Sequence, residues 1–145
     1  MEGLPAEFVQ ELYRQTAFLS AVFGGFAIAF MGALLTLHSE SKAVSRTIWI
    51  SAFAATFLIV ATFASTAVLL DLIRLEITSF NFEDWPASLR RSKTIADLSF
   101  FSGMYALLIA IGFSGNIRDK KTGIVTTTLA IIGLILLTIV LWGTL

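Results

Sequence analysis

Four long apolar stretches, separated by short polar segments, set the pattern of this chain. They cover about residues 16–37, 47–73, 94–114 and 123–145. The first carries no charged residue, and at about 1.5 Å per residue it forms a helix of roughly 33 Å, enough to cross a hydrocarbon core of about 30 Å. The pattern therefore predicts an all-α integral membrane protein, a multi-pass four-helix transmembrane bundle with short loops. One domain over residues 1–145 accounts for the whole pattern.

The segments between the stretches predict how the helices connect. Apolar residues follow Pro5 at helical spacing and predict a short N-terminal interfacial helix: Phe8, Val9, Leu12 and Tyr13. Residues 38–46 are few and polar, so the first two spans should form an antiparallel hairpin. Residues 75–93 form the only sizeable water-exposed connection, and 115–122 form a tight turn. The fourth stretch is apolar on almost every side, so we expect it to be the outermost helix, facing lipid.

Small residues recur at four-residue intervals on one side of the first stretch. This small ladder consists of Ala17, Ala21, Gly25, Ala29 and Ala33, and Ser20 and Gly24 flank it. A row of small side chains lets another helix backbone approach closely, which is the usual basis of helix association in membranes. The third stretch repeats the spacing with Ser102, Ala106 and Ala110. We expect both rows to be helix-packing surfaces, and the first row to drive self-association.

Hydroxyl side chains gather on one broad side of the second stretch, including Thr62, Ser65 and Thr66. Such groups bond across helices in a membrane, typically for about 0.6 kcal/mol and at most about 2 kcal/mol. Two interpretations stay open. The hydroxyls either pack against a neighbouring helix or line water in a pore.

Two carboxylates lie just inside the predicted spans. Asp71 is near the end of the second stretch and Asp97 near the start of the third, so antiparallel helices would place both near one leaflet boundary. A carboxylate at that depth is costly unless it faces a partner or water. Asp71 either pairs with Arg74 three residues on or lines water. Asp97 either caps its helix, where the dipole favours an anion, or lines water with Asp71.

Composition supports the membrane assignment and narrows the chemistry. Hydrophobic residues make up 57% of the chain and charged residues 14%, with ten basic and ten acidic side chains. A neutral chain lacks the basic surface that a nucleic-acid partner requires. There is no cysteine, and a lone histidine, His38, cannot supply a bis-histidine haem or a metal cluster. We therefore expect no metal, no cofactor and no enzymatic activity.

The basic residues leave the orientation in the membrane undecided. Five Lys and Arg fall on the side of the termini and five on the other side, so the positive-inside rule gives a tie. Acidic residues are uneven, with eight of ten on the terminal side, but that rule counts only Lys and Arg. An even number of spans places both termini on the same side, and we expect the cell or plasma membrane.

Several short runs resemble the Orai calcium-channel family. The run RQTAFLS at residues 14–20 is similar to the R-T-S-A-L-L-S sequence that opens the Orai pore helix. Residues 52–56 with 60–61 resemble the second Orai span, and residues 65–69 and 126–128 occur in the expected order. The resemblance covers four short patches of the chain.

This resemblance implies a plasma-membrane oligomer with four helices per subunit, in which the first helices ring a cation pore. In that family a glutamate lies near the outer mouth of the pore. Here no acidic residue occurs from 16 to 37, and Ala29 stands near the corresponding position. The resemblance therefore does not carry calcium selectivity by that device to this chain.

Together these features predict a homo-oligomeric membrane channel or pore that passes small ions. A four-helix chain with few residues outside its spans must place its site between helices or between subunits. The candidate pore-lining or mouth residues are Arg14, Ser20, Gly24, Thr62, Ser65, Thr66, Asp71 and Asp97. The alternative is a non-catalytic accessory or assembly subunit that binds the helices of another membrane protein.

Overall fold

The computed structural model describes residues 4–36, 41–74, 79–80, 86–118 and 120–144, and over these residues the chain is almost entirely helical. The helices are α1 Ala6–Leu35, α2 Lys42–Arg74, α3 Ala87–Arg118 and α4 Lys120–Thr144. Each contains a segment long and apolar enough to cross a membrane. The predicted all-α fold with four potential spans is confirmed. His38, and residues 75–78 and 81–85 of the expected connection at 75–93, lie outside the described residues.

Two short strands tie the start of α1 to the connection between α2 and α3. β1 Leu4–Pro5 pairs antiparallel with β2 Ser79–Phe80, with Leu4 opposite Phe80. The sequence pattern gave no indication of this pairing. It places Leu4 and Pro5 beside the connection that joins the end of α2 to the start of α3.

The first helix begins earlier in the structure than the apolar stretch at 16–37 predicts. A separate interfacial helix was expected before residue 16, but α1 is continuous from Ala6 to Leu35. No Gly or Pro interrupts residues 8–20, so nothing ends the helix there. Val9 and Tyr13 are buried and pack with residues of α2 and α3 instead of lying along a membrane surface. The prediction of a separate interfacial helix was therefore wrong.

The other helices begin earlier or end later than the apolar stretches alone indicate. Ser41 precedes α2, and its Oγ accepts a hydrogen bond from the Val44 backbone N–H at 3.2 Å, which is an N-cap. Pro86 precedes α3, a favourable place for a residue without a backbone N–H. At the other end α3 continues to Arg118 and α4 begins at Lys120, so most of the expected turn at 115–122 is helical.

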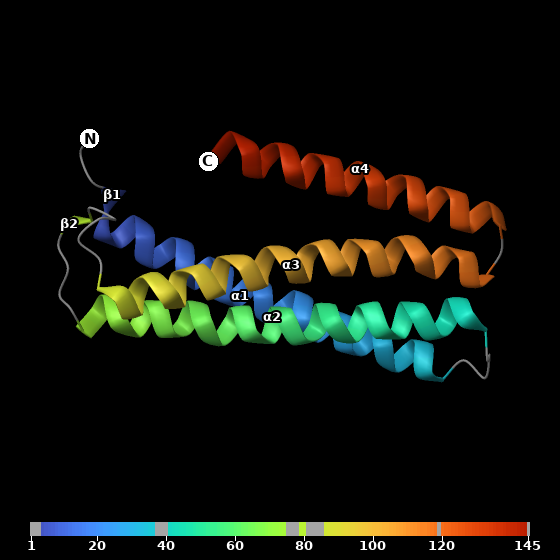
Figure 1. The fold of residues 1–145 in the computed structure, drawn as a ribbon, viewed down its shortest axis with the longest axis horizontal. Coiled ribbons are helices and arrows are strands. Elements are labelled where there is room, and N and C mark those ends of the chain that lie inside the picture. The colour runs from blue at the N-terminus through green and yellow to red at the C-terminus, as the bar shows by residue number, and fades with distance from the viewer. Residues whose placement is uncertain (1–3, 37–40, 75–78, 81–85, 119, 145) are drawn as a thin grey trace.

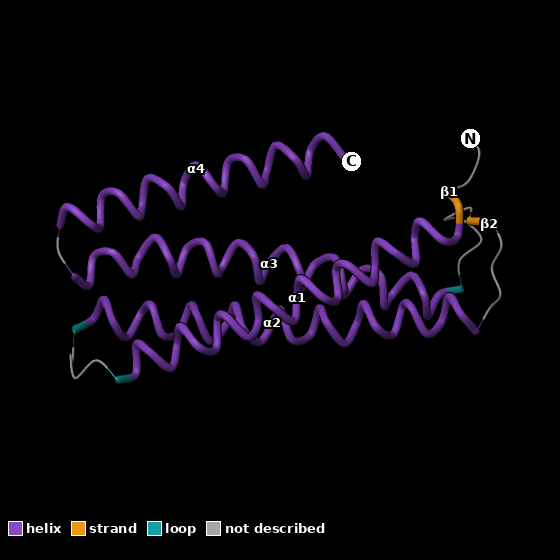
Figure 2. The backbone as a smooth tube through the Cα atoms, turned by 180° about the vertical axis from the view of Figure 1, so that it is seen from behind, coloured by secondary structure: helices purple, strands orange, loops and turns teal. Residues whose placement is uncertain are grey.

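Helices that follow each other in sequence also pack together. α1 packs on α2, α2 on α3 and α3 on α4, whereas α1 and α3 contact each other only slightly. Figures 1 and 2 show α2, α3 and α4 side by side, with α1 lying obliquely across one face of α2. The four helices thus form a layer of three with one crossing helix.

The buried face of α2 has the spacing of a coiled-coil seam. Apart from Ala55, its buried positions alternate three and four residues apart over the whole helix: Val44, Thr47, Ser51, Ala54, Leu58, Ala61, Ser65, Val68 and Leu72. On α3 the residues buried at related spacing are Leu89, Ala96, Ser99, Gly103, Ala106 and Ala110. A 3.5-residue repeat keeps two helices in contact along their length, and the small residues bring their backbones close.

α4 is the least enclosed helix. Of its most apolar segment 11% is buried, compared with 22–39% for the other three helices. Thr126 and Thr127 donate hydrogen bonds to the Gly112 carbonyl oxygen at 3.3 and 3.2 Å, and the Tyr105 and Thr138 hydroxyls are 2.6 Å apart. These contacts hold α4 on α3, while its remaining sides are apolar and exposed.

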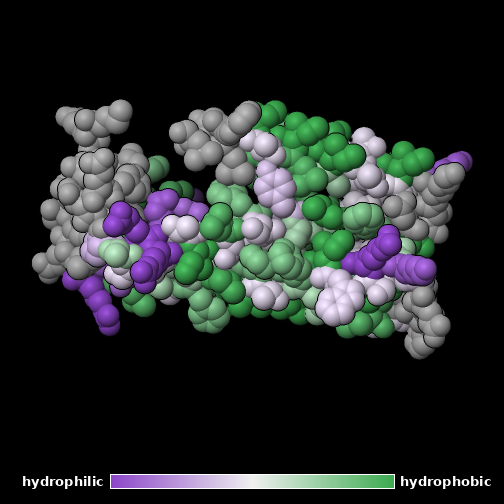
Figure 3. Space-filling view, viewed as in Figure 1, coloured by the Kyte–Doolittle hydropathy of each residue, from purple (hydrophilic) through white to green (hydrophobic). Residues whose placement is uncertain are grey.

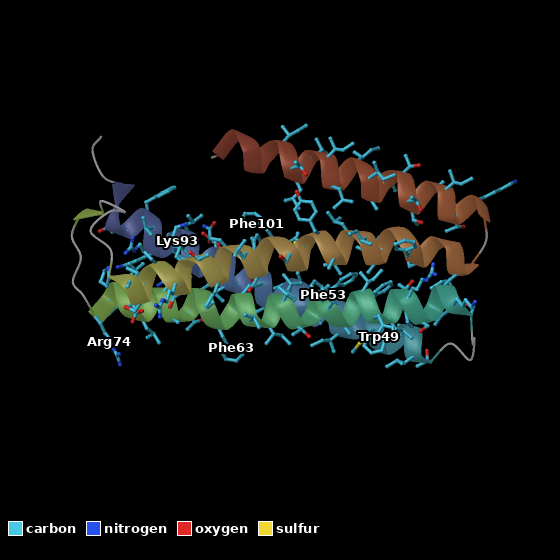
Figure 4. The ribbon with its side chains drawn as sticks, in the orientation of Figure 1. Trp49, Phe53, Phe63, Arg74, Lys93 and Phe101 are labelled. Atoms are coloured by element: carbon cyan, nitrogen blue, oxygen red, sulfur yellow. The ribbon has the colours of Figure 1, made fainter. Side chains whose placement is uncertain are left out.

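The surface has an apolar middle and polar ends. Figure 3 shows hydrophobic side chains over the centre of the long axis and hydrophilic side chains toward each end. Phe63, on the outer side of α2 in Figure 4, is 73% exposed. An apolar surface of this extent is typical of a protein surrounded by lipid.

Candidate functional site

The small ladder of α1 lies on the outer surface of the subunit. Ala21, Gly25, Ala29 and Ala33 are exposed, and Ala17 is half-buried. A Cβ added to Gly25 would meet no described atom within 4 Å. The ladder is thus open to another molecule over residues 17–33, about 24 Å of helix.

Bulky apolar side chains border this ladder. Phe18, Val22 and Phe26 are each about half exposed or more, and the Phe26 and Phe30 rings are stacked with their centroids 6.3 Å apart. A shallow strip of small residues beside a ridge of large ones can receive another helix, because the ridge of one helix packs into the groove of its neighbour.

The opposite face of α1 belongs to the interior of the subunit. Ser20 is buried and donates a hydrogen bond to the Thr16 carbonyl oxygen at 2.6 Å. Gly24 faces α2, where an added Cβ would lie 3.4 Å from the Leu58 Cβ. Ser20 and Gly24 thus lie between α1 and α2, on a different side of α1 from the exposed ladder.

The candidate hydroxyls of α2 lie in two environments. Ser65 is fully buried, and its Oγ has no hydrogen-bond partner among the described residues. Thr62 is half-buried and Thr66 exposed, and each donates to a carbonyl oxygen one turn back in its own helix, at 3.0 and 2.8 Å. Only Thr62 and Thr66 of these three reach the surface of the subunit.

The packing residues predicted on α3 lie beside α2. Ala106 is in the buried cluster formed with Ala54, Ala55 and Leu58 of α2, and Ala110 is also buried. Ser102 is half-buried. Their small size permits the close approach of α2 and α3.

Asp97 is part of a polar cluster near the start of α3. Its Oδ2 accepts a hydrogen bond from Lys93 Nζ at 2.7 Å, and each of the two side chains is about one third exposed. The buried Tyr13 of α1 lies near the Asp97 carboxylate. Asp97 therefore lies where α1 meets α3, beside Tyr13. Because α3 begins at Ala87, ten residues before Asp97, the expected capping role of Asp97 was wrong.

Asp71 does not take part in this cluster within the described part of the chain. It is half-buried and forms neither the expected ion pair with Arg74 nor a hydrogen bond with Asp97 there. Arg74 is exposed and points away from the other helices (Figure 4). The structure thus brings Asp97 together with Lys93 and Tyr13, and leaves Asp71 apart.

Lys93 and Tyr13 were not among the candidate residues from the sequence. The i,i+4 spacing of Lys93 and Asp97 is a signal that could have identified that pair. The contact of Tyr13 with Asp97 joins residues far apart in the chain, and no local pattern indicates it.

Arg14 lies near the start of α1, close to this polar cluster in sequence but on the outside of the subunit. Its guanidinium is 3.6 Å from the Glu11 carboxylate, and its side chain is 78% exposed. An exposed pair of this kind is weak, so the arginine stays available to water or to other charges.

An apolar groove runs between α2 and α3. It has a volume of about 690 Å³ and is lined mainly by Trp49, Phe53, Ala106 and Ile109. Its lining is almost entirely apolar, which suits a lipid chain or the side of another helix.

Comparison with known proteins identified no relative, since neither a protein-family model, nor a curated protein, nor a solved structure matches this chain.

Proposed function

We propose that the chain is a subunit of a homo-oligomeric membrane channel that passes small ions, with α1 of each copy packed around the symmetry axis. The observation that carries this proposal is the exposure of the small ladder of α1. The ladder offers a surface for close packing that is not used inside the subunit. A surface that allows close approach of backbones is what a ring of identical helices requires.

The proposed subunit crosses the cell or plasma membrane four times, with both termini on one side. Its expected partners are the lipid bilayer and further copies of itself. It is not an enzyme in this proposal. The resemblance to the Orai family supports the same arrangement, since the first helices line the pore there.

Selectivity in this pore comes from its width and its ends. The exposed ladder contains Ala and Gly and no charged residue, so a pore along it has no fixed charge in its middle. Arg14 is exposed near one end of α1, and copies of it around an axis form a basic ring. Such a ring hinders cations and favours anions.

Ion flux through reconstituted protein tests the proposal. Arg14→Gln should change the conductance or the anion-to-cation preference, because it removes the charge of the ring. Arg74→Gln is the matched control: it removes an exposed arginine at the same end of the molecule, but from α2 and pointing away from the other helices. We expect the control to conduct as the wild type does.

Two other results would count against this arrangement. If none of the proteins conducts over a range of ions and voltages, the channel proposal fails. If all conduct with the same selectivity, the channel stands but α1 does not line it, and the lining moves to the exposed hydroxyl side of α2 at Thr62 and Thr66.

The apolar groove between α2 and α3 favours a second function, an accessory or assembly subunit for another membrane protein. A groove of about 690 Å³ with Trp49 and Phe53 at its side can receive a partner helix. The oligomeric state in detergent separates the two functions. A stable ring of identical subunits supports the channel, and a non-conducting monomer supports the accessory subunit.

A further inference from the structure

One side of α3 packs against α4. This side extends beyond the contacts between the two helices, toward the start of α3. The two helices contact each other at Tyr105 and Thr138, and the last turns of α3 meet the first turns of α4. About two, three and four turns before Tyr105, on the same side of α3, are Leu98, Thr94 and Arg91. Figure 1 shows the start of α3 projecting beyond the described end of α4.

A basic pocket lies on this projecting part of α3. It has a volume of about 540 Å³, and its described lining comprises Ala87, Arg90, Arg91, Thr94 and Ile95. Arg90 and Arg91 are exposed, and neither forms an ion pair within the described part of the chain. The neighbouring Lys93, in contrast, is paired with Asp97. Two guanidinium groups at one pocket therefore have no carboxylate partner among the described residues.

The pocket is charged at one end and apolar at the other. Ile95 is 50% exposed and Leu98 is 63% exposed, one to two turns further along α3 than the arginines. A hydrocarbon core of about 30 Å needs about 20 residues of helix. Measured back from Gly115, the last residue of the apolar segment of α3, this length reaches about residue 95. Arg90 and Arg91 therefore lie at the level of the lipid head groups, and Leu98 lies within the hydrocarbon.

We propose that this pocket binds one anionic phospholipid. The guanidinium groups of Arg90 and Arg91 hold the phosphate, because arginine presents paired N–H donors that match phosphate oxygens. An acyl chain of the same lipid lies against Ile95 and Leu98. A free phosphate ion matches the arginines alone, whereas a phospholipid matches both halves of the pocket.

The experiment titrates the full-length protein, purified in a neutral detergent, with short-chain phosphatidylglycerol and counts bound lipid by native mass spectrometry. The double variant Arg90→Gln with Arg91→Gln should bind at least about tenfold more weakly, since each basic residue near an anionic surface changes affinity roughly fivefold. Short-chain phosphatidylcholine, which has no net charge, should bind weakly to both proteins.

The matched control is Arg46→Gln with Arg74→Gln, which removes two exposed arginines that are not among the described residues lining the pocket. We expect less than about a twofold change in that protein. An equal loss in both double variants overturns the proposal, because it shows only a general attraction between basic residues and anionic lipid.

A further variant separates a lipid from a free anion. Leu98→Ser changes an exposed side chain and leaves both arginines in place. Weaker binding of phosphatidylglycerol by this variant, with inorganic phosphate unable to displace the lipid at millimolar concentration, supports a phospholipid site. Unchanged lipid binding together with displacement by inorganic phosphate overturns it and assigns the arginines to a soluble anion. Ion flux is not a readout here, so the result stands apart from that of the channel proposal.

Discussion

Leu58 of α2 lies against a glycine of α1 and a glycine of α3. It is fully buried, with Gly24 of α1 on one side and Gly103 of α3 on the other. A Cβ on Gly103 would lie 2.7 Å from the Leu58 Cγ and 3.2 Å from the Leu58 backbone nitrogen. Because a backbone atom is among these neighbours, a change of side-chain rotamer cannot make enough room. Glycine at 103 is thus required by the distance between α2 and α3.

Gly103→Ala should therefore destabilise the protein by about 1–3 kcal/mol, the usual cost of adding a methyl group to a close-packed core. Gly25→Ala is the matched control, since its Cβ meets no described atom within 4 Å and alanine favours a helix over glycine. Thermal unfolding in detergent, followed by circular dichroism, checks both. Equal melting temperatures for Gly103→Ala and the wild type would contradict the close approach.

The ion pair of Asp97 and Lys93 is expected to contribute modestly to stability. Both side chains are about one third exposed, so water screens part of their attraction. In a double-mutant cycle with Asp97→Asn and Lys93→Gln, we expect a coupling energy of about 1 kcal/mol that falls as salt is added. Additive effects of the two substitutions would show that the pair contributes nothing to folding. Tyr13→Phe reports separately on the contact of Asp97 with α1.

At the level of single helices, α1 presents two faces of different use. Gly24 faces Leu58 inside the subunit, while Gly25 on the next position faces outward. Gly25→Leu should leave the fold intact and disrupt self-association, because a branched side chain blocks the approach of another helix backbone. Gly24→Leu should instead lower the melting temperature of the subunit itself. Chemical cross-linking in membranes, together with unfolding in detergent, distinguishes the two variants.

If oligomers of Gly25→Leu persist unchanged, the small ladder is not part of the interface between subunits. In that case the exposed strip of α1 would be a lipid-facing surface, and the proposed ring of α1 helices would be ruled out.

The sequence predicts which segments are helical better than it predicts which of their sides are buried. Four apolar stretches were enough to predict four helices, because no other regular structure satisfies its backbone within a single span. The first turns of α1 were predicted as helical, but as a separate interfacial helix, because no local pattern shows that Val9 and Tyr13 are buried by α2 and α3. The seam of α2 was also missed, since lipid-facing and protein-facing positions are both apolar.

For the candidate site, too, the sequence indicates the segments better than it indicates which of their sides are buried. The spacing of small residues predicts packing surfaces on α1 and α3, yet it cannot tell an interior surface, such as Ala106, from an exposed one, such as Ala29. Asp97 was identified as an unusual charge, but its contact with Tyr13 depends on how α1 crosses the layer. Contacts between distant parts of the chain are the part that local patterns omit.

For the whole molecule, the even distribution of basic residues makes its orientation easy to change. Arg14, Arg74, Arg90, Arg91 and Lys93 face Lys42, Arg46, Arg118, Lys120 and Lys121 across the proposed membrane, five on each side. Cytoplasmic loops retain Lys and Arg, so a tied count gives no preference and a difference of three decides the insertion. Replacing Arg118, Lys120 and Lys121 with Gln should hold both termini in the cytoplasm. Replacing Arg74, Arg90 and Arg91 with Gln should hold both termini outside, and it leaves the Lys93–Asp97 pair intact.

Labelling of single cysteines measures the orientation. Because the chain has no cysteine, Ser41→Cys and Ser88→Cys can each be introduced alone as reporters at opposite ends of the helices, and a membrane-impermeant thiol reagent is added to intact cells. We expect the first set to label only at position 41 and the second only at position 88; the same labelling in both sets would show that features other than Lys and Arg fix the orientation.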